Sequence, residues 1–349
     1  MKHPITTVAI CLLAACSQGS TPPEVQSYSS SATVPTAAAS TAALHKPSVT
    51  ESLERHVVHL GPFDLPARTT PEKMRDKPAR ATFHVDQAMW ITGFEPSVTD
   101  GAGNSLPGEL VHLAIMANHG ETNPLCETEN TGNPIAAVTS TMKSINIPNG
   151  FGYAVLPDDA LEVTLVLHNP TDQNFNDVHF SFTLVGTPMQ TSQPVQDVAP
   201  LLLDSDPCHH APLAVEPGGY VHNTHRFTIP AAGSVIGAYG LLQDFGVEVG
   251  LQKESEKTPF WQAAAKINEH HQITALPTYD GEPVPLKAGD GIILSVSYQN
   301  SSDQWLNDAT AAAMIYMARG SQDTSPAASK PYHRKSAEPA VAVQSLLMK

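Results

Sequence analysis

The chain has 349 residues and more acidic than basic side chains, 34 Asp and Glu against 19 Lys and Arg, for a formal net charge of −15. This balance argues against nucleic acid as a partner, because affinity for phosphates depends chiefly on Lys and Arg. At roughly 150 residues per domain, the length suggests about two domains. The 16 His residues are many for a chain in which only 15% of residues are charged.

Residues 1–15 have the features of a secretory signal peptide. Lys2 precedes an apolar run at 8–13, which is far shorter than the ~20 residues that a membrane helix needs. The run ends in Leu-Ala-Ala-Cys, which resembles the bacterial lipobox, so we expect Cys16 to carry lipid. The alternative is an ordinary signal peptide cleaved near Ala15, which leaves Cys16 as a free thiol.

The residue after Cys16 predicts a location. Ser17 stands there rather than Asp, and by analogy with the Gram-negative sorting rule this favours the outer membrane. We therefore expect a protein of the bacterial cell envelope that is attached to the membrane through its lipid. Residues 16–52 are rich in Ser, Thr, Ala and Pro, as are residues 320–349. Such segments cannot bury a core, so we predict a disordered tether and a disordered tail.

Short strand-like segments separated by Pro, Gly, Asn and Asp fill the chain between the tether and the tail. Strands at this spacing indicate an all-β fold, and we predict two tandem antiparallel, jelly-roll-like β-sandwich domains at 53–192 and 193–319. One large continuous sandwich is the alternative. Only 259–267 suggests a helical turn. The expected strands are 88–94, 109–117, 161–169, 177–185, 220–229, 234–240, 246–252, 267–276, 291–300 and 312–318.

Two cysteines remain in the predicted domains, Cys126 and Cys208, because Cys11 lies in the signal peptide. An oxidising envelope would allow them to form one disulfide, but sequence does not show whether their Cα atoms approach within bonding range. Both possibilities stay open. The absence of a Cys-x-x-Cys motif from the sequence argues against a redox motif or a thiolate zinc site.

The segments 90–116, 145–172, 237–252 and 287–309 together resemble the copper type II monooxygenase superfamily, typified by peptidylglycine α-hydroxylating monooxygenase. They are most similar to its bacterial and plant relatives labelled stress-up-regulated nodule proteins. The resemblance implies two copper-bearing β-sandwich domains that face a solvent gap. One domain supplies electrons, and the other binds oxygen and substrate.

The first copper site of that family uses a His-His pair and a third His. The pair falls on His112 and Leu113, so one ligand is missing, while the third falls on His168. Residues two apart on a strand share a face, so Met116 is expected beside His112. Two imidazoles and a thioether would suit Cu(I). The alternative is that Met116 belongs to the core and both histidines are hydrogen-bonded to the backbone.

The second copper site of the family uses a His-x-His pair and a Met. Those positions fall on Leu241, Gln243 and Thr310, so the resemblance implies that this centre is lost. Leucine has no donor atom, and neutral amide and hydroxyl oxygens hold Cu(I) poorly. No His-x-His occurs anywhere in the sequence. Hydroxylation in the manner of the family is therefore expected to fail, and we expect no catalytic residues.

These observations predict an envelope lipoprotein that binds a small ligand or a single copper ion without catalysis. One alternative is an active copper- and ascorbate-dependent monooxygenase whose ligands are shifted in sequence. The other is a purely structural or interaction lipoprotein. Adjacent histidines on a strand face opposite ways, so we do not expect His209 and His210, or His270 and His271, to share a metal.

Overall fold

The structure is a computed structural model that describes residues 53–75, 77–126, 132–140, 142, 144–190, 195–205 and 213–319. The predicted signal peptide, lipidation site, tether and tail lie outside these residues, and so does Cys208. The chain divides into two compact units, Met1–Val49 and Thr50–Lys349, and the description below concerns the second. Among the described residues, no helix is long and apolar enough to span a membrane.

The predicted all-β fold with two tandem antiparallel β-sandwiches is confirmed. The strands of the first half are β1 (Glu54–Leu65), β2 (Ala79–Phe83), β3 (Met89–Thr99), β4 (Val111–Asn118), β5 (Asn133–Val138), β6 (Ile145–Asn146), β7 (Phe151–Val155), β8 (Leu161–Leu167) and β9 (Phe175–Pro188). The described helices are short, α1 (Glu72–Arg75) and the 3-10 turn η1 (Gly108–Leu110).

The second half repeats the pattern of short strands. They are β10 (Gln196–Asp204), β11 (Leu213–Val215), β12 (Tyr220–Thr228), β13 (Gly233–Leu241), β14 (Gly246–Lys253), β15 (Trp261–Ala264), β16 (Lys266–Ile267), β17 (Ile273–Ala275), β18 (Val284–Leu286), β19 (Gly291–Gln299), β20 (Leu306–Ala309) and β21 (Ala312–Arg319).

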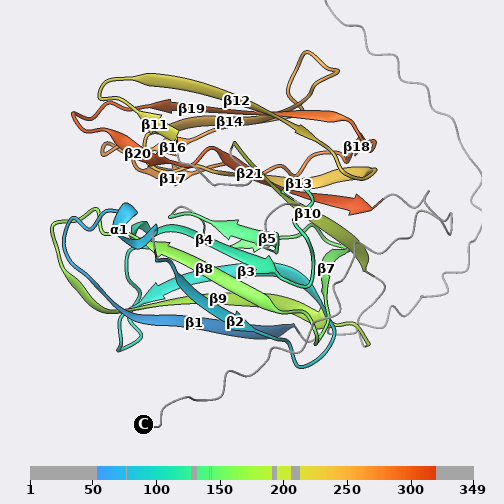
Figure 1. Cartoon of the computed structure of the whole chain (residues 1–349), viewed down its shortest axis with the longest axis horizontal. Helices are drawn as coiled ribbons and strands as arrows, with labels where there is room; N and C mark the ends of the chain where they lie inside the picture. The colour runs from blue at the N-terminus through green and yellow to red at the C-terminus, as the bar shows by residue number, and fades with distance from the viewer. Residues whose placement is uncertain are drawn as a thin grey trace, which may run out of the picture. The chain divides into compact units, whose positions relative to one another are not determined.

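One sheet runs through both halves, in the order β1-β9-β3-β7-β10-β21-β13-β18. The halves join where β7 and β10 pair in parallel, at Phe151 with Gln196 and Gly152 with Asp197. A second sheet, β2-β8-β4-β5, covers the first half, and β12-β19-β14-β15 covers the second. Figure 1 shows β12, β19 and β14 on the far side of β21 from β4 and β5.

Two hydrophobic clusters fill the layers, and the first one crosses from one half to the other. It contains the inward residues of β8, such as Val163 and Leu165, and also Tyr239 and Tyr316 from the second half. The Tyr239 hydroxyl accepts a hydrogen bond from the Ala137 backbone N–H (3.3 Å). The second cluster lies between β21 and the β12-β19-β14-β15 sheet. The halves therefore pack on each other through buried apolar side chains.

The same turn closes both sandwiches. The Asn169 side-chain amide donates to the carbonyls of Leu65, Pro66 and Gln173, at 2.6–3.0 Å. Its oxygen accepts from the backbone N–H and the hydroxyl of Thr171. Both side chains are fully buried, and Asn300 makes the equivalent set of bonds. Its partners are Val215, Glu216, Gln304 and Ser302.

Two expectations about local structure were wrong. The segment 259–267 contains β15 and β16 rather than a helical turn, because Trp261 and Ala263 point inward while their neighbours are exposed, a period of two. The segment 267–276 is not one strand. It breaks at a tight turn in which the Asn268 side chain accepts from the backbone N–H groups of His270 and Gln272.

Candidate functional site

His112 and His168 come together, as the sequence predicted. Their rings lie edge to face, with centroids 5.3 Å apart and planes at 67°. His112 is in β4, and His168 directly follows β8, which pairs with β4. His112 is 5% exposed, so the pair is sheltered from water.

Met116 does not follow His112 on the same face. Val111 pairs with Leu167 and Leu113 with Val166, so β4 has one extra residue there and His112 occupies a β-bulge. A bulge interrupts the alternation of side chains and re-aims the residue it contains. Met116 is fully buried in the first core, in the row of Ala114. The expected shared face is therefore broken at His112.

The surroundings of His168 hold its ring in place. Its backbone N–H donates to the Leu110 carbonyl (3.0 Å), and its ring hydrogen-bonds to the backbone carbonyl of Glu109. Burial lowers the pKa of His168 below its ordinary value of 6.5, and this effect outweighs the Glu109 hydrogen bond and the nearby charge of Glu72, which both raise it. The imidazole is neutral at pH 7, the form that binds metals.

Gln243 links His112 to the second half of the chain. Its side-chain oxygen accepts a hydrogen bond from the Thr310 backbone N–H (2.7 Å). This fixes the orientation of the amide, so its nitrogen faces His112, 3.1 Å from the ring atom Nε2. An amide nitrogen only donates, and His112 must therefore present a lone pair at that atom. Tyr298 supports the arrangement by bonding to the backbone of both Gln243 and Thr310.

The positions aligned with the second copper centre meet in space. Gln243 and Thr310 are hydrogen-bonded, and Leu241 pairs with Ala312 at the start of β21. None of them offers a soft donor, since Leu241 is buried in the core and the Gln243 amide is already bonded. The solvent gap that the resemblance implies is closed here, because Gln243 touches His112 directly.

The sequence did not identify Gln243 as a partner of His112. It entered the sequence argument only as a missing ligand, and a hydrogen bond between residues 131 positions apart leaves no local signal. The carbonyl of Glu109 was equally hidden, because every residue has one. Both contacts depend on how the halves pack.

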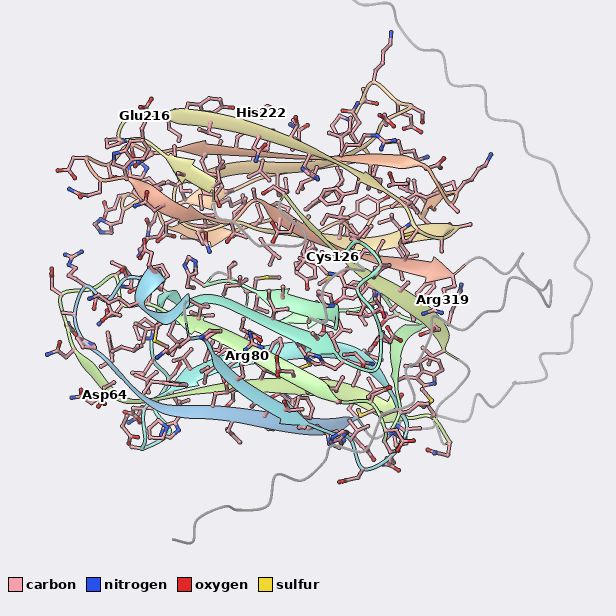
Figure 2. All side chains as sticks on the ribbon, viewed as in Figure 1. Asp64, Arg80, Cys126, Glu216, His222 and Arg319 are labelled. Carbon is pink, nitrogen blue, oxygen red and sulfur yellow. The ribbon has the colours of Figure 1, made fainter. Side chains whose placement is uncertain are left out.

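The remaining histidines of the described chain are dispersed. His222 lies on the outward face of β12 (Figure 2), where it bonds to the Ser297 hydroxyl (2.9 Å). His271 stacks on Phe245 with ring centroids 5.4 Å apart, and His270 is exposed beside Glu269. Within the described residues no group of three or more His, Cys, Asp or Glu could hold a metal ion.

Cys126 is disulfide-bonded in the structure. Its predicted partner Cys208 falls outside the described residues, as do His209 and His210. The pairing of Cys126 with Cys208 stays a prediction.

No protein-family model and no curated protein matches this chain. Among solved structures, the STIV MCP is 11% identical with a TM-score of 0.33, covering 76% of this chain and 96% of that one. The major capsid protein P2 from Bacteriophage PM2 is 10% identical with a TM-score of 0.31, covering 77% of this chain and 99% of that one. Likenesses this distant carry no functional argument.

Proposed function

We propose that this protein is a lipid-anchored protein of the bacterial envelope that binds a single copper ion through His112 and His168 without activating oxygen. The observation that carries the proposal is the buried contact between the two imidazole rings. The lipid anchor rests on the lipobox-like sequence at Cys16.

The donor set fits Cu(I). Two neutral imidazoles are borderline donors that copper accepts. Histidine ligands usually donate their second ring N–H to a carbonyl or carboxylate, which fixes the tautomer and the ring orientation. The Glu109 carbonyl has this role for His168. Bound copper would supply a redox-active or ligand-binding centre. Met116 is not part of the proposed set, because the bulge separates it from His112.

A second copper centre does not fit. Leu241 has no donor atom, and the Gln243 amide is held between Thr310 and His112. Thr310 takes part through its backbone N–H and carbonyl. We therefore propose no oxygenation step, and the proposed function is binding.

Titration of the mature chain with Cu(I), against a chromogenic chelator, tests the proposal. Replacing Cys16 by Ser in all samples removes a thiol that would otherwise compete for copper. We expect one copper ion per chain with sub-micromolar affinity, lost in both His112→Ala and His168→Ala. The matched control is His270→Ala, since the His270 side chain is 73% exposed, and Met116→Leu should bind as the parent does.

Three outcomes would contradict this function. Copper binding that survives both histidine substitutions places the metal elsewhere. No binding favours a structural role or a different ligand. Two copper ions per chain with ascorbate-dependent oxygen uptake would support an active monooxygenase instead.

A further inference from the structure

A cavity of about 600 Å³ opens between the two halves, close to the histidine pair. Glu109 and Thr139 line it from the first half, and Asp244 and Gln272 line it from the second. Apolar side chains, including Leu106, complete the wall. The volume lies within the ~300–1,000 Å³ of pockets that hold small organic ligands, and it is far larger than a metal ion needs.

The cavity has two carboxylates and no basic partner for either of them among the described residues. Asp244 accepts a hydrogen bond at Oδ1 from the Ile273 backbone N–H (3.3 Å). Glu109 accepts one at Oε2 from the side chain of Gln272 (2.5 Å). Burial raises the pKa of Asp244, and the negative charge of Glu109 raises it further, so the two groups lie near enough to interact. Each keeps one oxygen without a hydrogen-bond partner in the described chain.

A single turn holds both carboxylates in place. Asn268 donates from its side chain to the Gln272 side-chain oxygen (2.9 Å), which turns the Gln272 nitrogen toward Glu109. Ile273, the next residue, holds Asp244. The negative charges are thus positioned before any ligand arrives, which reduces the cost of ordering them on binding.

Thr139 is an independent sign that a ligand belongs in this cavity. It lines the same wall, its side chain is 2% exposed, and its hydroxyl has no hydrogen-bond partner in the described part of the chain. A buried hydroxyl without a partner is unfavourable. A hydrogen-bond donor in the cavity would relieve that cost.

We propose that this cavity binds a primary ammonium ion carried on an aliphatic body. Three acceptors are open, at Glu109, Asp244 and Thr139, and a primary ammonium has three N–H donors and no acceptor. The apolar wall suits the aliphatic part, and the carboxylates repel anions. This site does not depend on the proposed copper site and uses none of its ligands.

Isothermal titration with n-hexylamine at pH 7 tests the proposal, with 1-hexanol and hexanoate as the uncharged and anionic counterparts. We expect binding of the amine alone. A hydrogen bond to a charged group contributes about 1.5–3 kcal/mol, and about 1.4 kcal/mol corresponds to a factor of ten. Asp244→Asn and Glu109→Gln should therefore each weaken hexylamine binding about tenfold or more, and Thr139→Val should weaken it several-fold.

The control for general electrostatics is Glu269→Gln, because Glu269 is 88% exposed and lies in the same turn. It should leave hexylamine affinity unchanged. The proposal is overturned if hexylamine does not bind, if hexanol binds equally well, or if the paired Asp244→Asn and Glu109→Gln change has no effect in a folded variant. His112→Ala should abolish copper binding and leave amine binding intact, so the two proposals fail separately.

Discussion

Gln243 competes for the nitrogen lone pair that a metal would need. A neutral imidazole has one lone-pair nitrogen, and the Gln243 amide donates to His112 at Nε2. Copper can bind His112 only by displacing that hydrogen bond. The same amide bridges to Thr310, so one side chain both ties the halves together and limits access to the site.

Gln243→Leu should therefore change copper affinity and stability in opposite directions. Removing a net hydrogen bond of about 0.5–1.5 kcal/mol should tighten Cu(I) binding by up to about tenfold. The Thr310 backbone N–H then lacks its partner, so the free energy of unfolding should fall by about 1–3 kcal/mol. Chelator competition and denaturant titration measure the two effects. Gln262→Leu, at an exposed position of β15, should change neither.

His168 predicts how stability depends on pH. Because burial lowers its pKa in the folded protein, the unfolded chain takes up a proton first as the pH falls below about 6.5. The stability from the neutral ring is fully present above that pH and is lost as the pH falls toward the folded pKa. Denaturant titrations at pH 7.5 and 5.5 should show a smaller loss in His168→Asn than in the parent. An equal loss in both would contradict this reading, and the exposed-site variant His270→Asn should match the parent.

The paired asparagine turns are the elements that close each sandwich. Asn169 and Asn300 each donate to three carbonyls from a fully buried side chain. An aspartate in either place would put a carboxylate against three carbonyl oxygens. No local rearrangement of one residue can replace so many bonds.

Asn169→Asp and Asn300→Asp should each lower the free energy of unfolding by about 3 kcal/mol, through lost hydrogen bonds and a buried charge without a partner. Thermal and denaturant unfolding measure the loss. Asn307→Asp is the matched control, because Asn307 is an exposed residue of β20 and should change stability by less than about 0.5 kcal/mol. Equal, small effects at all three positions would mean that the turns are not needed for closure.

Strand positions were largely predictable from sequence, whereas the geometry of the site was not. Alternation in 161–167 gave the buried row of β8, because a strand with one buried face must alternate. The bulge at His112 has no comparable signal, since it depends on the register between two strands. The repeat was present but unread: residues 169–177 and 300–308 share Asn, a hydroxyl residue, Asp-Gln and a final Asn-Asp.

The whole molecule is tied together by the sheet that passes through β7 and β10 and by the core that crosses the halves. Separating the halves would expose Tyr239 and Tyr316, which are almost fully buried. The length alone suggested two domains of ordinary size. The packing predicts that neither half is stable without the other.

Unfolding should therefore be a single cooperative transition. Trp90 lies in β3 of the first half and Trp261 in β15 of the second, so variants that keep one tryptophan each report on one half. With Trp305 replaced by Phe in both, the two fluorescence curves in guanidinium should coincide. Two separate midpoints would show that the halves unfold independently. Adding Asn300→Asp should shift both curves together.

The repeated turn also has an evolutionary consequence. His168 directly precedes Asn169, and Gln299 directly precedes Asn300, so a copied unit placed an imidazole next to one turn and an amide next to the other. Each turn closes its own sandwich through its own backbone bonds. Side chains between the copies, such as Leu241 and Gln243, are free to drift by mutation without loosening either frame. A metal centre can therefore disappear from such a chain while the architecture that once framed it persists.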